Sequence, residues 1–223
     1  MRFDPGRGLV DSPSRFCYTV RMKIYNVLGF AILALHILLS AFLAPPWLGP
    51  WWGMAVGFGY LVIFWFLAGI YLSDIIHLGI AHRALDYKEW FMKTVTLVNN
   101  AFGVYVDPVS WVNRHRLHHK FADHAGDPNK LDSDGFWKTL YLCVFPYPVT
   151  ADLATDDILK TWPFRLVSHP LFIVISPVLS CGLLWLVVRD WKFAIGVWIG
   201  VRVFALWVNM VQNYWTHDRR WGT

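Results

Sequence analysis

The chain has 223 residues, of which 56% are hydrophobic and 17% aromatic, and its mean hydropathy is +0.40. This composition is too apolar for an ordinary soluble domain of that length. The net charge of +5 comes largely from basic residues that flank apolar stretches, so we expect contact with membrane lipids and no nucleic-acid binding.

Four apolar stretches come close to the roughly 20 residues that a transmembrane helix needs. They cover residues 27–44, 51–72, 171–188 and 193–211. We therefore predict an all-α membrane protein with four transmembrane helices, arranged as two hairpins. A polar N-terminal segment, residues 1–24, precedes a membrane domain that covers residues 25–223.

The distribution of lysine and arginine predicts the orientation in the membrane. Five basic residues precede the first stretch, ten lie between residues 83 and 165, and two follow the fourth stretch, while the turn at residues 45–50 has none. Seventeen of the twenty thus fall on one side, which is expected to be cytosolic together with both termini. The host membrane would be a bacterial inner membrane or the endoplasmic reticulum. The region between the hairpins is predicted to form a helical cytosolic cap, in which residues 91–106 form a helix that does not cross the membrane.

Histidines are concentrated in the cap, in the sequence WVNRHRLHHKFADHAGDP. On a helix, His115, His118 and His119 have positions i, i+3 and i+4 and share one face. Imidazole is a common ligand of zinc, copper, iron and nickel. This face is therefore a candidate surface for binding a transition metal.

Two more elements lie at the cytosolic ends of predicted spans. His77 and His82 in HLGIAHR are separated by about 140° on a regular helix, so they would reach two metals, or one metal if the helix ends between them. Asn213 and His217 in NYWTH share a face at the end of the fourth span. The topology brings six histidines to one membrane surface, which exceeds the four ligands of a structural zinc site and favours a dinuclear centre. The single His36, His124 and His169 are expected to be ordinary hydrogen-bonded or surface residues.

These motifs resemble those of the integral-membrane fatty-acid desaturases, most closely the Δ9 acyl-CoA or acyl-lipid type. HLGIAHR is similar to the first histidine box of the family, WVNRHRLHHKFADHAGDP to the second, and NYWTH to an element of its fourth helix. The resemblance implies oxygen-dependent formation of a double bond, with Δ9 specificity, in an acyl chain, as in the biosynthesis of unsaturated fatty acids. No catalytic residue beyond the metal centre is implied.

The resemblance also implies a di-iron cofactor with dioxygen as co-substrate. The electron donor would be a separate protein such as a cytochrome or a ferredoxin, and the substrate a fatty acyl chain carried by coenzyme A or a lipid. Asn213 would act on one iron through a water molecule. The implied iron ligands are His77, His82, His115, His118, His119 and His217.

Metal-bound imidazoles usually need an outer partner that orients the ring. Asp74, Asp123 and Asp127 are the candidates. Trp65 on the second span and Trp111 beside the histidines are candidates for lining the acyl tunnel.

Two features depart from the family pattern. Asn129 follows the Asp-Pro of the second box, where the family usually has histidine. The sequence ends at DRRWGT, before the third box with which the family completes its ligand set, so a C-terminally truncated, inactive fragment is an expectation beside that of an active desaturase. A related membrane di-iron hydroxylase or ketolase, and a non-enzymatic remnant, are the alternatives.

Overall fold

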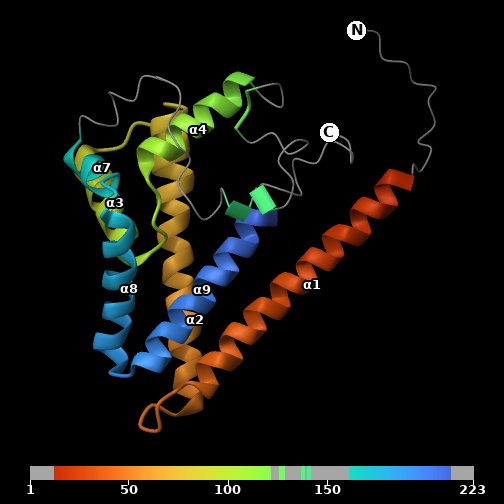
Figure 1. Ribbon diagram of the computed structural model, residues 1–223, viewed down its shortest axis with the longest axis vertical. Helices are drawn as coiled ribbons and strands as arrows, with labels where there is room; N and C mark the ends of the chain where they lie inside the picture. The colour runs from red at the N-terminus through yellow and green to blue at the C-terminus, as the bar shows by residue number, and fades with distance from the viewer. Residues whose placement is uncertain (1–12, 122–125, 129–136, 139, 142–160, 212–223) are drawn as a thin grey trace.

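The structure is a computed structural model that describes residues 13–121, 126–128, 137–138, 140–141 and 161–211. Its described secondary structure is entirely helical, as predicted (Figure 1). The elements are α1 (Pro13–Phe42), α2 (Gly49–Gly69), the π-helix η1 (Ile70–Ala81), α3 (Glu89–Phe102), α4 (Pro108–Phe121), α7 (Trp162–Val167), α8 (Phe172–Val188) and α9 (Trp191–Met210).

Three helices in the described part of the chain are long and apolar enough to cross a membrane, which indicates an integral membrane protein. They are Lys23–Phe42 within α1, Gly49–Ala81 formed by α2 and η1, and Trp191–Met210, which is α9. The remaining predicted span corresponds to α8, an apolar helix of 17 residues. Because α8 is shorter than the usual span, the four-span arrangement remains a prediction.

The apolar helices pair in sequence order. α1 contacts α2, α8 contacts α9, and the two connecting turns lie at the same end of the molecule, opposite α4 (Figure 1). Arg189 ends α8 in the left-handed conformation with φ 59°. Asp190 then caps α9, because its carboxylate accepts a hydrogen bond of 2.8 Å from the backbone N–H of Phe193. A turn of this kind needs only two residues to reverse the chain.

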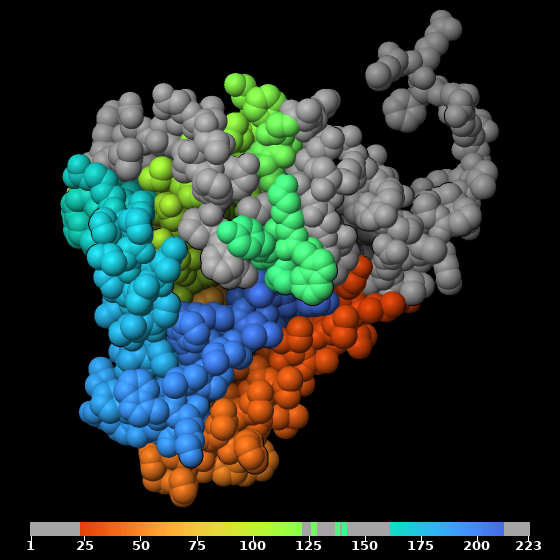
Figure 2. Space-filling model, viewed as in Figure 1, coloured from red at the N-terminus to blue at the C-terminus, as the bar shows by residue number. Residues whose placement is uncertain are grey.

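Closely approaching glycines bring α1 against α2 and α9, and Figure 2 shows α1 packed along α9. Gly53 and Gly57 of α2 face Ser40, while a Cβ at Gly200 of α9 would collide with the ring of His36. His36 is buried and its Nε2 lies 3.1 Å from the carbonyl oxygen of Gly57, to which an Nε2–H would donate. The small-xxx-small spacing is typical of helix contacts in membranes. His36 is thus a hydrogen-bonded packing residue, as expected for it from the sequence.

The close contact of Gly53 with α1 leads to a testable prediction for the stability of the protein. A Cβ at Gly53 would lie 2.5 Å from the backbone oxygen of Ser40 and 2.5 Å from Cβ of Ala44, so Gly53→Ala must push α1 away from α2. We expect a loss of about 1–3 kcal/mol, measured as unfolding of the chain in detergent. The matched control is Gly59→Ala on the same helix, where a Cβ meets nothing within 4 Å. Equal stability of the two variants would contradict the tight α1–α2 contact.

α3 overlaps the predicted cap helix at residues 91–106, but it packs among the apolar helices; that it does not cross the membrane stays a prediction. It has 14 residues and packs against α8, α7, α2 and η1. In Figure 1 it runs alongside α8 toward the middle of the bundle, and the chain then returns to α4. A helix of this length that enters the bundle from one side is typical of a re-entrant segment.

The largest apolar core described joins η1 to α4 and α7. Since most of its members belong to one face of η1, this core holds α4 across the end of η1. Its buried residues are Tyr71, Ile75, Ile76 and Ile80 of η1, Val112 of α4 and Phe164 of α7.

Candidate metal centre

The π-helix η1 places His77 and His82 on the same side. A π-helix has i→i+5 hydrogen bonds, and the N–H of His82 accordingly donates to the carbonyl oxygen of His77 over 3.0 Å. The two Nε2 atoms lie 3.1 Å apart. Of the two alternatives expected from the sequence, the structure has the one in which the helix ends between the histidines, since η1 ends at Ala81 and His82 is its C-terminal cap. The wider turn of η1 also removes the separation of about 140° that a regular α-helix gives. Both side chains therefore reach one point.

α4 supplies His115 and His119 from one face, as the i, i+4 spacing predicts. Their Nε2 atoms lie 3.0 Å apart. Asp107 precedes α4, and its carboxylate accepts a hydrogen bond of 3.0 Å from the N–H of Val109. Arg116 donates to the carbonyl oxygen of Ile80 over 2.9 Å and so ties α4 directly to η1. This role of Arg116 was not predicted from the sequence, although its position between ligand-type histidines was a signal.

The two pairs converge. Potential ligand nitrogens of His77, His82, His115 and His119 all lie within 4.8 Å of one another. The Nε2 atoms of His82 and His115, which come from different helices, are 3.0 Å apart. Two nitrogens that each lie about 2.1 Å from one ion are separated by ~3.0–3.4 Å. The 3.0–3.1 Å separations of the neighbouring pairs His77–His82, His82–His115 and His115–His119 therefore fit ligands of a shared transition metal, for which imidazole is suitable.

Burial and mutual repulsion lower the pKa of two imidazoles of the cluster, those of His115 and His119. Burial, and after it repulsion between the protonated forms of His115 and its neighbours His119, His77, His82 and His118, together lower the pKa of His115 to about 3. Burial, followed by the same kind of repulsion, also lowers the pKa of His119. Only the neutral imidazole binds a metal. At neutral pH, His115 and His119 are thus in the form that ligation needs.

His118 differs from its neighbours. Its Nδ1 lies 2.9 and 3.0 Å from the two carboxylate oxygens of Asp127, whose side chain is fully buried. With the proton on Nδ1 donating to this carboxylate, Nε2 keeps its lone pair and can bind a metal. His118 is outside the four-histidine cluster, and its ring centroid is 6.5 Å from that of His115. Its assignment as a ligand, and that of Asp127 as its outer partner, remain predictions.

The two tryptophans predicted to line a tunnel have different environments. Trp111 stacks on His115, with ring centroids 4.8 Å apart and planes at 15°, and meets His77 edge-on. Trp65 is 44% exposed on α2 and packs against Phe204 of α9. Trp111 therefore contacts the cluster directly, whereas Trp65 contacts a neighbouring apolar helix.

The remaining predicted site residues divide into two groups. Asp74 lies in η1, one turn before His77, and its carboxylate has no hydrogen bond to a histidine of the described region. Asn213, His217 and Asp123 lie outside the described residues. Their roles stay predictions from the sequence.

Comparison with known proteins supports the resemblance first noted in the histidine boxes. The chain is 25% identical over 207 residues to Delta-9 acyl-lipid desaturase 1 of Arabidopsis thaliana, covering 88% of this chain and 63% of that relative. Two sn-1 stearoyl-lipid 9-desaturases are also similar. The Synechocystis protein is 26% identical over 84% of this chain and 57% of its own length, and the Anabaena variabilis protein 28% identical over 82% and 63%.

The chain thus spans about 57–63% of the length of these relatives. No protein-family profile matches it, and no solved structure does. The matches show distant homology, over most of this chain, to the Δ9 acyl-lipid desaturases of the membrane fatty-acid desaturase family.

Proposed function

We propose that this chain, as a distant homologue of the Δ9 acyl-lipid desaturases, holds the metal centre of a membrane desaturase that introduces a double bond, at Δ9, into a fatty acyl chain. The observation that carries the proposal is the convergence of His77, His82, His115 and His119, which come from the two histidine boxes, on one point. Homology contributes the reaction class and iron, since four imidazoles alone do not distinguish iron from other transition metals.

The proposed reaction converts two adjacent methylenes, dioxygen, two electrons and two protons into an alkene and two waters. Bound iron would supply the activation of dioxygen that this reaction requires. The electrons would come from a separate cytochrome or ferredoxin. The acyl chain would be lipid-linked or carried by coenzyme A, and the complete ligand set would include His118, His217 and a water held by Asn213.

The described residues would prepare the site for that metal. Neutral His115 and His119 present lone pairs, and Asp127 fixes the tautomer and orientation of His118. Trp111 covers one face of the His115 ring and restricts its rotation. In the proposed orientation the cluster faces the cytosol, at the end of the bundle opposite the turns between paired helices (Figure 1).

Product analysis tests the function. The full chain, supplied with iron, a reduced electron donor and ¹⁸O₂ in membranes containing stearoyl lipid, is expected to yield acyl chains lighter by two hydrogens. The Synechocystis stearoyl-lipid desaturase in the same membranes is the positive control. A product that retains ¹⁸O would identify a hydroxylase instead. Absence of iron and product, with an active control, would show that these 223 residues alone do not form a working centre.

A further inference from the structure

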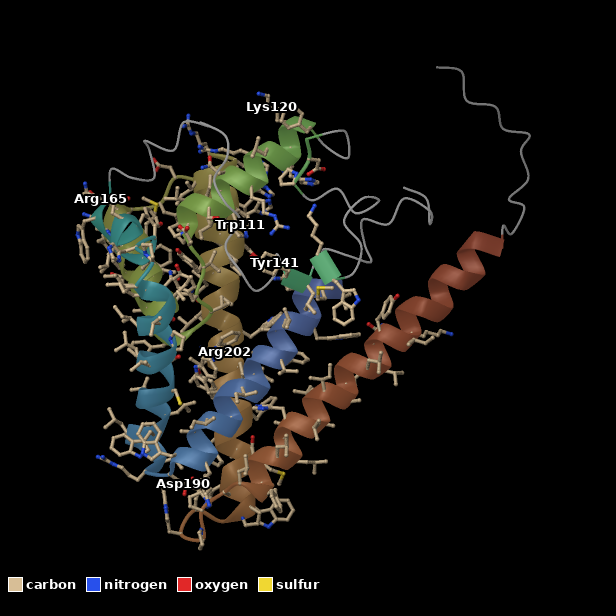
Figure 3. The ribbon with its side chains drawn as sticks, viewed as in Figure 1. Trp111, Lys120, Tyr141, Arg165, Asp190 and Arg202 are labelled. Atoms are coloured by element: carbon tan, nitrogen blue, oxygen red, sulfur yellow. The ribbon has the colours of Figure 1, made fainter. Side chains whose placement is uncertain are left out.

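Arg202 is a charged residue near the middle of α9, a helix otherwise apolar enough to span a membrane. In Figure 3 it lies between the helices, at a depth between Asp190 at the turn and Trp111 beside the histidines. A charge at such a depth costs several kcal/mol unless it is paired, and it commonly marks a functional position. In the sequence, Arg202 lies within the apolar stretch at residues 193–211, and no neighbouring residue in that stretch carries a charge.

The guanidinium of Arg202 is hydrogen-bonded to three other helical segments. Nη2 donates to the carbonyl oxygen of Gly103 over 3.2 Å and to Ser180 Oγ of α8 over 3.1 Å, and Nη1 donates to Tyr60 Oη of α2 over 3.4 Å. The guanidinium carbon lies 3.8 Å from the ring centroid of Trp198, a cation–π contact. No Asp or Glu side chain among the described residues forms an ion pair with it. Neutral acceptors and an aromatic ring thus stabilise this charge.

Gly103 is the C-terminal cap of α3, so Arg202 binds the C-terminal end of this helix. The hydroxyl of Tyr60 also donates to the carbonyl oxygen of Phe102, the last residue of α3, over 3.4 Å. The C-terminal carbonyls of a helix carry a partial negative charge of about half an electron, which a buried cation complements. Arg202 and Tyr60 therefore satisfy carbonyl groups at the end of α3 that have no partner within the helix.

The segment after Gly103 is fixed to the same helix end. The side-chain amide of Asn99 donates to the carbonyl oxygen of Val104 over 2.7 Å, and the amide oxygen of Asn100 accepts from the N–H of Val106 over 2.9 Å. Asp107 follows at once and caps α4. The depth of α3 in the bundle therefore determines where α4 begins.

We propose that Arg202 is a positioning residue, which anchors the C-terminal end of α3 within the membrane and through the 103–107 segment sets the place of the α4 histidines relative to η1. The second half of this proposal rests on the proposed metal function. The first half concerns the fold alone. Two separate measurements can therefore test them.

The test uses the full chain in lipid nanodiscs, with Arg202→Met as the main variant and Arg202→Lys as the conservative one. Arg189→Met is the matched control, because Arg189 lies over Trp185 at the α8–α9 turn, away from the histidines. Amide hydrogen exchange of residues 89–107 measures how firmly Arg202 holds the C-terminal end of α3. Cobalt(II) alone reports the metal site through its affinity and its d–d absorption spectrum.

In Arg202→Met, we expect the amide hydrogens of residues 89–107 to exchange faster, while those of α1 exchange as in wild type. We also expect this variant to bind cobalt about tenfold more weakly, with an altered d–d spectrum. Arg202→Lys should give smaller changes, since an ammonium keeps the charge but not the planar fork of donors. If exchange in Arg202→Met matches that in Arg189→Met, the anchor is refuted. If exchange rises but cobalt binding and spectrum do not change, the link to the histidines is refuted.

A wild-type chain that binds no cobalt would refute the proposed metal centre and the second half of the proposal together. The anchor would still be decided by hydrogen exchange, so the two failures are distinguishable. If Arg202→Met does not fold, the exchange and spectrum of Arg202→Lys decide both parts by the same comparisons with Arg189→Met.

Discussion

Replacing His115 with alanine is expected to abolish stoichiometric metal binding by the chain. The Nε2 atom of His115 lies 3.0 Å from those of both His82 and His119, so this residue links the η1 histidines with those of α4. Without it, the remaining nitrogens lose their common neighbour. We expect the affinity for cobalt or iron to fall by more than the roughly 10–100-fold that loss of an outer contact causes. Titration of the purified chain with cobalt or iron measures the affinity, and metal analysis of the chain then measures the stoichiometry.

His169→Ala provides the control for His115→Ala. His169 is an exposed residue before α8, where its Nδ1 accepts a hydrogen bond of 3.3 Å from the N–H of Leu171. Its removal should leave metal binding unchanged. Stoichiometric, tight metal binding by His115→Ala would mean that the four-histidine cluster is not the metal site.

The convergence of the two histidine boxes was predictable because it follows from hydropathy and topology. His77 was predicted at the end of an apolar span, and His115 and His119 on one helical face of the cap. The exact relation of His77 to His82 was not predictable. Hydrophobic periodicity was interpreted with 3.6 residues per turn, whereas η1 has hydrogen bonds five residues apart, which the apolar pattern does not encode.

The limits of the helices show the same contrast. The second span was predicted to end at residue 72, near the first polar residues, but the helix continues to Ala81 because Ile75, Ile76 and Ile80 pack against α4 and α7. Tertiary burial thus extends a helix beyond the stretch that hydropathy alone identifies. The contact between Arg202 and Gly103 joins residues 99 positions apart, and no local pattern in the sequence indicates it.

Asp127→Asn is expected to weaken metal binding by roughly 10–100-fold without unfolding the chain. The carboxylate of Asp127 is fully buried and accepts from Nδ1–H of His118, which holds the ring with Nε2 free. An asparagine has nearly the same shape. However, its amide can present an N–H to Nδ1, which would favour the other tautomer of His118 and leave a proton on Nε2.

The measurement for Asp127→Asn compares cobalt affinity and d–d spectrum with those of wild type and of Asp86→Asn. Asp86 is an exposed carboxylate in the segment between η1 and α3, so its variant removes the same charge without touching a histidine. Equal affinities in the two variants would show that only net charge matters and that His118 is no ligand. A selective loss in Asp127→Asn, with an altered spectrum, would support His118 as a ligand in addition to the four-histidine cluster.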